Sequence, residues 1–299
     1  HPSIAFGGLD GTSETSNEAW EIKADQYGNY EVTKLRPTGT RPGTKWLCAS
    51  VYDPTLDRFI ITMGGDKNAV SSEVWELSFT GSDQGVWTQR TPTGSATAVA
   101  GPGYANKASN NRLYIFGGAT NVALTTTSTQ LVYLDYTTTN CAWASPTSSG
   151  GTARRTPVLV YDGTNDKLIV FGGYSGSASL QTLSYWDVAA AGAWANAVPT
   201  TDMPDARRSH AGVFVNDKFT ISVGRSDSSL WYKDTWELTP NYGTPNSSTW
   251  VNKMPRAYHP AYIFHDPNTT GAYHWQTWAT EDSVDSTKVA FGSNTESFA

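Results

Sequence analysis

A short motif recurs five times along the chain and constrains the fold more than any other feature. Each copy is a hydrophobic residue followed by a glycine pair, which is reduced to a single glycine in the last copy. The first glycines stand at positions 7, 64, 117, 172 and 224, so the spacings are 57, 53, 55 and 52 residues. A fixed period of this size predicts a repeat architecture in which each copy is one structural unit.

Each unit carries the signals of short antiparallel strands. Two apolar runs precede the glycine pair, as in residues 49–52 and 58–62, and turn residues such as Asp53-Pro54 separate them. A glycine pair allows a tight exit from the second strand with positive φ. Four strands per unit are expected, and further tryptophans close most units, namely Trp87, Trp143, Trp194 and Trp250.

This pattern resembles the kelch repeat, whose period is about 50 residues. The resemblance implies an all-β, kelch-type β-propeller in which each unit is one blade. A lone four-stranded blade cannot bury both of its faces, so neighbouring blades have to stack around an axis. The tryptophans are then expected to fill the wedge between blades.

The number of blades depends on how the two ends of the chain meet. The chain begins at the second strand of a blade, so the innermost strand of that blade has to come from elsewhere. Residues 256–264, 272–275 and 288–291 read as further strands. We therefore expect one monomeric domain over residues 1–299, with six blades and a ring closed between the terminal segments. Five blades with a C-terminal tail are the alternative.

Charge and hydropathy exclude two classes of partner. The chain has 21 basic and 27 acidic residues, which gives a net charge of −6. A protein that binds nucleic acid by neutralising phosphates needs an excess of Lys and Arg, so no nucleic-acid partner is expected. No stretch approaches the roughly 20 apolar residues of a membrane helix, so no membrane partner is expected either.

Other features of the sequence predict a secreted protein. The chain starts at His1 without an initiator Met or an apolar signal segment, as a processed chain does. Glycosylation sequons begin at Asn246 and Asn268, both in turn-like sequence. Ser, Thr, Asn and Gly dominate the polar positions rather than Lys and Glu. We expect an extracellular glycoprotein with a carbohydrate or another extracellular ligand.

Kelch-like units typically carry Arg-x-x-His where the innermost strand begins, near one mouth of the central channel. Alignment of the units on their glycine pairs places Cys48, Tyr104, Pro157, His210 and His259 at that histidine position. Cys48 and Tyr104 would then occupy equivalent positions of adjacent blades and approach each other across the pore. Cys141 is expected at the outer edge of its blade, far from Cys48 and not bridged to it.

This set resembles the copper site of the galactose oxidase family, which is also a kelch-type propeller. The resemblance rests on Cys48 in Leu47-Cys48-Ala49-Ser50, on Tyr104 after Gly103, and on Tyr258-His259 after Arg256. It implies a Cys48–Tyr104 thioether and a copper ion bound by Tyr104, Tyr258, His259 and His210. The last of these replaces a histidine that the family takes from a further domain.

Such a site oxidises a primary alcohol of a carbohydrate and releases hydrogen peroxide. Imidazole and phenolate suit Cu(II), and Tyr258 would accept the hydroxyl proton as a general base. This chain departs from the family, which usually has seven blades and carries a further domain. The family's stacking tryptophan follows a glycine pair where this chain has Ala119-Thr120, and Trp46 is the candidate for that part.

Two other functions share the channel mouth. The first is an eliminating polysaccharide lyase, in which His210, His259 and Tyr258 act as base and acid. Its uronate carboxylate would be bound by arginines that recur there, namely Arg154, Arg155, Arg207, Arg208 and Arg256. The second is a non-catalytic propeller that binds a glycan or a protein. Structural roles are also open, with the arginines in salt bridges between blades and Cys48 as inert core.

Overall fold

The computed structural model describes residues 3–8, 16–24, 29–199, 202–228 and 231–253 with their side chains, apart from those of Ala24 and Ser149. It also describes the backbone of three strands, at residues 262–265, 272–280 and 289–297. The chain divides into two compact units, His1–Asn252 and Lys253–Ala299. None of the helices in these described parts has the length and apolar character needed to cross a membrane.

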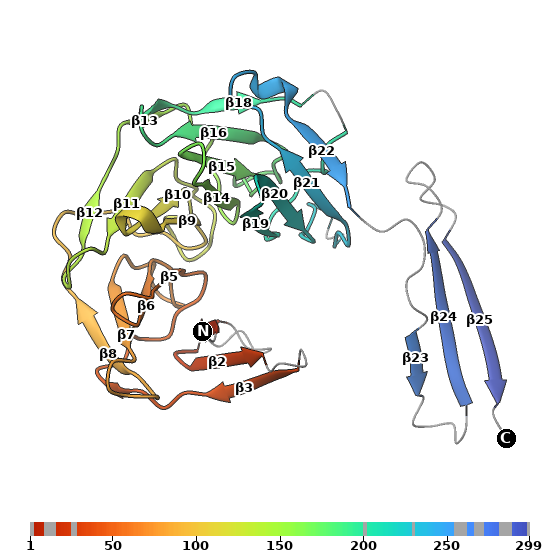
Figure 1. Cartoon of the computed structure of the whole chain (residues 1–299), viewed down its shortest axis with the longest axis horizontal. Helices are drawn as coiled ribbons and strands as arrows, with labels where there is room; N and C mark the ends of the chain where they lie inside the picture. The colour runs from red at the N-terminus through yellow and green to blue at the C-terminus, as the bar shows by residue number, and fades with distance from the viewer. Residues whose placement is uncertain are drawn as a thin grey trace. The chain divides into compact units, whose positions relative to one another are not determined.

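The first unit consists of five antiparallel sheets that follow one another in sequence, and each sheet is one blade (Figure 1). Blade 1 has three strands, β1 (Ser3–Phe6), β2 (Ala19–Ala24) and β3 (Tyr30–Lys34). Blade 2 consists of β5 (Ala49–Asp53), β6 (Arg58–Thr62), β7 (Val74–Ser78) and β8 (Val86–Arg90). Blade 3 consists of β9 (Gly103–Lys107), β10 (Arg112–Phe116), β11 (Leu131–Asp135) and β12 (Ala142–Ala144).

Blades 4 and 5 repeat the same strand order. Blade 4 consists of β14 (Val158–Asp162), β15 (Lys167–Phe171), β16 (Leu183–Asp187) and β18 (Ala195–Ala197). Blade 5 consists of β19 (Ala211–Val215), β20 (Lys218–Ser222), β21 (Thr235–Thr239) and β22 (Thr249–Asn252). The all-β kelch propeller predicted from the repeat is therefore confirmed, with five blades.

Short pieces complete the first unit. β4 (Thr38–Gly39) pairs in parallel with β8, and β13 (Ser148–Ser149) pairs in parallel with β17 (Gly192–Ala193), so two linkers run along the outer edge of the blade that follows. The helices of the described residues are two 3₁₀ turns, η1 (Ala108–Asn110) and η2 (Pro245–Ser247).

The second unit is a three-stranded antiparallel sheet of β23 (Tyr262–His265), β24 (Ala272–Thr280) and β25 (Val289–Ser297). Strands were predicted in these three regions. Blade 1 lacks the innermost strand that blades 2 to 5 have, as its sequence predicted. A sixth blade and a single domain closed between the terminal segments stay predictions.

The core of the first unit lies between successive blades. In blades 2, 4 and 5 the closing tryptophan packs against the aromatic residue before the glycine pair of the preceding blade, and in blade 3 Trp143 shares a core cluster with Met63 of blade 2. Ring centroids lie 5.1 Å apart for Phe6 and Trp87, 4.5 Å for Phe116 and Trp194, and 5.2 Å for Phe171 and Trp250. The closing tryptophans are at most 7% exposed, so their predicted place in the wedge is confirmed.

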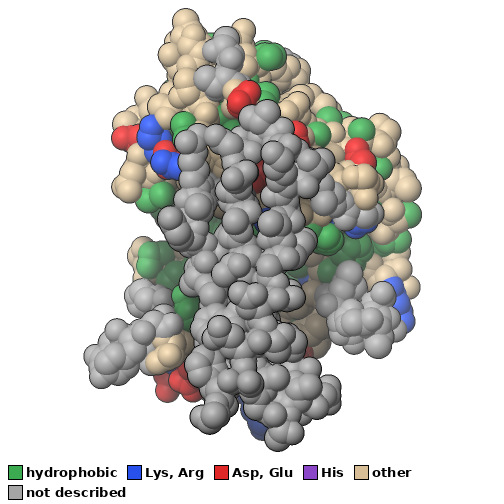
Figure 2. Space-filling view, turned by 90° about the vertical axis from the view of Figure 1, so that its right-hand side faces the viewer, with side chains coloured by type: hydrophobic (Ala, Val, Ile, Leu, Met, Phe, Trp, Pro, Cys, Tyr) green, Lys and Arg blue, Asp and Glu red, His purple; other side chains and the backbone are tan. Residues whose placement is uncertain are grey.

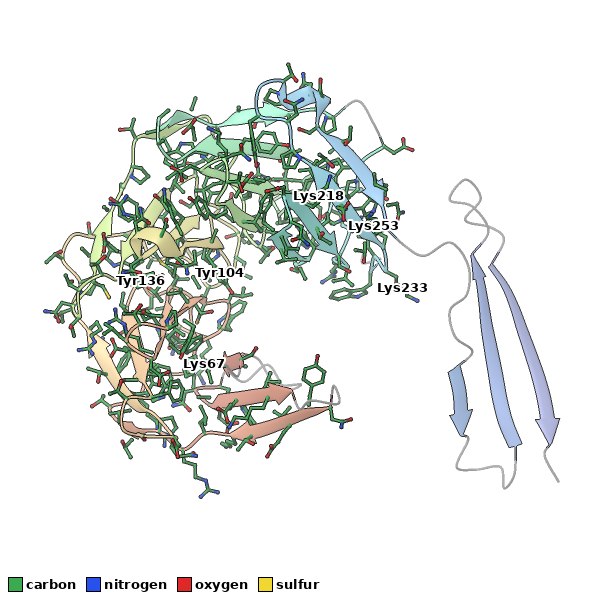
Figure 3. All side chains as sticks on the ribbon, viewed as in Figure 1. Lys67, Tyr104, Tyr136, Lys218, Lys233 and Lys253 are labelled. Atoms are coloured by element: carbon green, nitrogen blue, oxygen red, sulfur yellow. The ribbon has the colours of Figure 1, made fainter. Side chains whose placement is uncertain are left out.

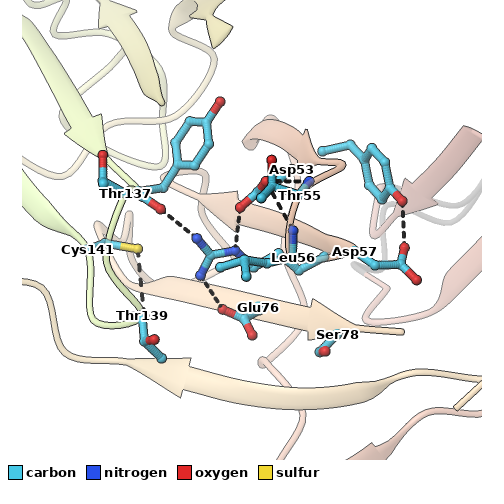
Figure 4. Close-up of polar contacts among 12 residues, drawn as sticks. Asp53, Thr55, Leu56, Asp57, Glu76, Ser78, Thr137, Thr139 and Cys141 are labelled. Atoms are coloured by element: carbon cyan, nitrogen blue, oxygen red, sulfur yellow. Dashed lines mark hydrogen bonds and ion pairs between the residues drawn. The ribbon is translucent and has the colours of Figure 1, made fainter. Parts of the chain in front are cut away.

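A buried polar group also joins blades 2 and 3, at the end of the inner strands where β5 stops (Figure 4). The Arg58 guanidinium donates to the Asp53 and Glu76 carboxylates, at 2.9 Å each, and to the Tyr136 carbonyl oxygen. Arg58 is 1% exposed, so these acceptors replace the water that the charge would otherwise need. This network belongs to the scaffold and leaves the opposite end of the strands for a site.

Candidate functional site

The innermost strands of blades 2 to 5 begin from a set of residues that are hydrogen-bonded from blade to blade. The Gly101 amide donates to the Leu47 carbonyl oxygen at 2.9 Å, the Thr156 amide to that of Gly101, and the Ser209 amide to that of Thr156 at 3.1 Å. All four residues have left-handed backbone, with φ between 49° and 61°. These bonds define the channel mouth, and the following residue in each blade starts the inner wall.

The structure corrects the predicted alignment in blade 3. Cys48, Pro157 and His210 each directly precede an innermost strand, and the residue in that place in blade 3 is Pro102. Tyr104 is the second residue of β9, two positions further along the chain. Cys48 and Tyr104 are therefore not equivalent residues of adjacent blades. The four equivalent residues stand 14 to 16 positions before the first glycine of their blades, whereas Tyr104 stands only 13 before Gly117.

Tyr104 and His210 nevertheless line one pocket, at the start of β9, β14 and β19. The pocket has a volume of about 340 Å³. Most of its lining residues carry apolar side chains, but polar atoms form the larger part of its exposed wall. The lining residues are Pro102, Tyr104, Pro157, Val158, Leu159, His210, Ala211 and Gly212. Tyr104 is 40% exposed, and Figure 3 shows it on the inner side of the arc of blades. We call this the channel pocket.

His210 is the more deeply buried of the two polar side chains of the channel pocket, and the Phe171 backbone lies next to its ring as a weak hydrogen-bond partner. Its side chain is 8% exposed, and neither ring nitrogen makes a hydrogen bond of ordinary geometry among the described residues. The ring lies against Gly172 of blade 4, where an added Cβ would come within 2.7 Å of Cε1. Burial, and then the charge of Arg207, lower the pKa of His210 to about 3, so the ring is neutral at pH 7.

Cys48 does not line the channel pocket. Its Sγ lies against Gly64 of its own blade, and burial raises the pKa of the thiol to about 11. Cys141 directly precedes β12, the outermost strand of blade 3, and is buried there in the core. Both cysteines are free thiols, placed at opposite edges of their blades as expected. Trp46 is half-buried beside Gly65, and its Nε1 donates to the Asp66 carbonyl oxygen.

Arg207, predicted to bind substrate, is a structural residue. It is 0% exposed, and its guanidinium forms a bidentate ion pair with Asp234 at 2.6 and 2.8 Å. Nε and Nη1 also donate to the carbonyl oxygens of Asp205 and Val223, so every nitrogen of the group has a partner. This position inside blade 5 opposes a role in binding a ligand.

The described residues do not assemble a copper site. Tyr104 and His210 are the predicted ligands that share a pocket, and no group of three His, Cys, Asp or Glu residues gathers anywhere in the described part of the chain. Tyr258, His259 and Arg256, as well as the sequon residue Asn268, lie outside the described residues. The Cys48–Tyr104 thioether and the copper ion stay predictions.

Arg155 and Arg208, two of the arginines predicted at the channel mouth, form a cluster with Tyr174, Arg225 and Trp231, which the sequence reasoning missed. The guanidinium carbons of Arg155 and Arg208 lie 4.6 and 4.4 Å from the centroid of the same ring, that of Tyr174. Arg225 pairs with Arg208 across a β-bridge and lies 5.8 Å from the ring of Trp231. These five residues are the blade 4–5 cluster. Tyr174 directly follows the glycine pair of blade 4 and Arg225 follows the single glycine of blade 5, and this shared position was the sequence feature that could have indicated them.

Five sheets of this order, closed by tryptophans and opened by glycine pairs, define a kelch-repeat β-propeller. The chain belongs to the KLHDC2/KLHL20/DRC7 Kelch-repeats domain family, whose family model matches residues 55–266. A solved structure titled "Structure of YjhT" is similar, with a TM-score of 0.60 and 14% identity over 83% of this chain and 80% of that chain. At that identity the likeness concerns the fold alone. No curated protein matches the chain.

Proposed function

We propose that this protein is an extracellular carbohydrate-binding propeller that holds a sugar ring in the channel pocket. The observation that carries the proposal is the composition of that pocket. Apolar side chains and polar atoms both contribute to its wall, and Tyr104 and His210 supply a phenol group and a neutral imidazole. Ligand sites commonly combine such a wall with a few polar groups that set orientation.

A pyranose matches this wall in shape and in polarity. Its C–H face packs on aromatic and proline rings, and its hydroxyl groups need hydrogen-bond partners when they leave water. Both ring nitrogens of His210 are buried and lack a well-formed hydrogen bond among the described residues, with only the Phe171 backbone close to the ring as a weak partner, so a ligand hydroxyl that reached them would add a hydrogen bond. A neutral imidazole can donate from one nitrogen and accept at the other.

The character of the surface supports the proposed extracellular location. In Figure 2 the described surface is mostly tan and green, and few charged side chains interrupt it. Only 16% of all residues are charged, against about a quarter in a typical soluble domain. Asn246, the first sequon residue, is exposed in η2, where a glycan can project into solvent.

A titration with neutral and acidic oligosaccharides tests the proposal. We expect saturable binding to at least one of them, and Tyr104→Ala should weaken it by about tenfold or more, which corresponds to 1.4 kcal/mol. Tyr30→Ala is the matched control, because Tyr30 is 73% exposed on β3 and remote from the inner strands. Binding that Tyr104→Ala and Tyr30→Ala affect equally would refute the channel pocket.

The same samples separate binding from the two predicted enzymatic activities. An intact mass two hydrogens below the sequence mass, with peroxide formed from galactose-type alcohols after copper loading, would favour the oxidase. New near-ultraviolet absorbance from a polyuronate would favour the lyase. The proposed binding function expects an unmodified peptide at Tyr104 and neither product.

A further inference from the structure

The blade 4–5 cluster is not required by the kelch fold. Its residues pair through two isolated β-bridges that recur at the same place in every complete blade. The first bridge joins the linker before the innermost strand to the turn after the glycine pair, and the second joins that turn to a residue further along the chain. In blades 2 and 3 these places hold no charged residue: Trp46, Gly65 and Val70 in blade 2, and Ala100, Ala119 and Thr127 in blade 3. The fold therefore forms these bridges without arginine, and the charge of the cluster needs another explanation.

Arg155 has no counter-charge in the described structure. It is half-buried, no carboxylate lies within ion-pair distance of it among the described residues, and its Nε has no hydrogen-bond partner there. Burial and the neighbouring charge of Arg208 lower the pKa of Arg155, which shows that the cation is in an unfavourable field. Two other buried cations have counter-charges, since Lys45 pairs with Glu73 and Arg207 with Asp234, whereas Arg154 has none among the described residues but is fully enclosed.

Arg208 is already partly neutralised, and its partner can be exchanged. Asp227 accepts a hydrogen bond from the Arg208 guanidinium and others from Ser179, and its side chain is 48% exposed. A carboxylate bound from solvent would meet Arg155 unpaired and Arg208 paired with a surface aspartate. Arginine binds planar carboxylates through two parallel hydrogen bonds, which makes such a group the natural ligand.

The cluster lies directly beside the channel pocket. Arg155 and Arg208 each stand two residues before a lining residue of that pocket, Pro157 and His210. Trp231, whose side chain is 61% exposed, lies beside Arg225 on the same blade and offers a stacking surface. A sugar ring in the pocket would therefore place its neighbours in a chain near the cations and the indole.

We propose that the blade 4–5 cluster binds the carboxylate of a uronate-containing glycan, with Arg155 as the principal ligand and Trp231 stacked on an adjoining sugar ring. This inference rests on the proposed function and names its substrate class. Two different groups of this chain thus serve one ligand. The channel pocket holds a neutral or an acidic sugar ring, and the blade 4–5 cluster favours the ligand that carries the carboxylate.

The experiment compares oligogalacturonate with its methyl ester, which has the same sugar chain without the charges. The full chain should bind the acid about tenfold or more tightly than the ester. Arg155→Gln should abolish that difference and leave the affinity for the ester unchanged. Arg36→Gln removes the same charge at an exposed position between blades 1 and 2, and should preserve the preference.

Two further variants distinguish a binding site from a structural one. Asp227→Asn removes the internal competitor of the ligand and should tighten binding of the acid several-fold, whereas loss of a scaffold contact would weaken it. Trp231→Ala should weaken binding of both acid and ester. Melting temperatures identify any variant that fails to fold, and Asp227→Asn then keeps the proposal testable.

The outcomes separate this inference from the function it rests on. Equal affinity for acid and ester overturns the carboxylate site and leaves the carbohydrate-binding propeller intact. No binding of either form, or of any other oligosaccharide, overturns both. A glutamate-rich peptide of the same charge that binds as tightly as the acid overturns the assignment to a glycan.

Discussion

Blade 4 holds a buried arginine that has no ion-pair partner in the described part of the chain, and blade 5 shows what that partner would be. Arg154 and Arg207 are each 0% exposed and make the same first contacts. In both, Nε donates to a carbonyl oxygen two residues earlier, and Nη1 donates to the residue that follows the second strand, Gly172 or Val223. The two side chains are therefore structural equivalents.

The difference lies at the residue before the third strand. In blade 5 this residue is Asp234, which pairs with both terminal nitrogens of Arg207. In blade 4 it is Thr182, whose Oγ1 is buried without a hydrogen-bond partner among the residues that the structure describes, as is Nη2 of Arg154. Burial without a carboxylate lowers the pKa of Arg154 to about 10, a direct sign of the missing charge.

Thr182→Asp should therefore stabilise the protein. Hydrogen bonds to charged groups contribute about 1.5–3 kcal/mol, and burial of the new carboxylate offsets part of that, so we expect a gain of about 1–2 kcal/mol. In the opposite direction, Asp234→Thr leaves Arg207 buried and unpaired, which costs about 3–5 kcal/mol. One kcal/mol shifts the melting temperature of a chain of this size by about 2–4 °C.

Thermal unfolding followed by circular dichroism, with urea titration for the free energy of unfolding, measures both effects. Thr182→Asn is the matched control, because it has the shape of aspartate without the charge. We expect Thr182→Asp to melt at a higher temperature than Thr182→Asn. We expect Asp234→Thr to melt well below the unmodified chain. A Thr182→Asp protein that melts below Thr182→Asn would refute the equivalence of the two arginines.

Three further predictions concern the channel mouth. Gly172→Ala should destabilise the protein by about 2–4 kcal/mol, because φ is +64° and an added Cβ would lie 2.6 Å from the Arg207 carbonyl oxygen. Gly163→Ala, with 3.6 Å to its nearest neighbour, should have little effect in the same urea titration. Because the folded pKa of His210 is about 3 and an unfolded histidine titrates near about 6.5, the unfolded state binds the extra proton between these values. Stability contributed by this ring is complete above about pH 6.5 and falls by about 1.4 kcal/mol per unit as the pH drops towards 3, a slope that His210→Gln should remove. Cys48, with a pKa of about 11, should react with iodoacetamide at pH 8 about a thousandfold more slowly than a fully ionised thiol, and equal rates in native and unfolded protein would contradict its burial.

The strands and the stacking of the blades could be predicted from the sequence because their signals are local. The apolar run at residues 58–62 is the strand β6, and Asp53 ends β5 immediately before the expected turn. The glycine pairs and closing tryptophans repeat with the blades, so one correct unit predicts the others. A repeated sequence constrains repeated hairpins, whose partners are only a few residues apart.

The register between blades was misassigned in blade 3 although the spacing was available. Pro102 stands 15 residues before Gly117, within the 14 to 16 residues that separate Cys48, Pro157 and His210 from the first glycines of their blades, whereas Tyr104 stands only 13 before it. The hydrogen bonds that join Gly101 to Leu47 and Thr156 show directly which residues of neighbouring blades are equivalent.

The sequence by itself determined a kelch propeller and a channel mouth rich in arginine, and the tertiary structure decided which arginine can meet a ligand. Arg207 and Arg208 are adjacent in the chain, yet Arg207 is sealed by Asp234, 27 residues away, and Arg208 lies against Tyr174 of another blade. Side chains of successive residues in extended backbone point to opposite sides. Which side is filled by protein and which is open depends on the neighbouring blade, and that contact exists only after the blades have stacked.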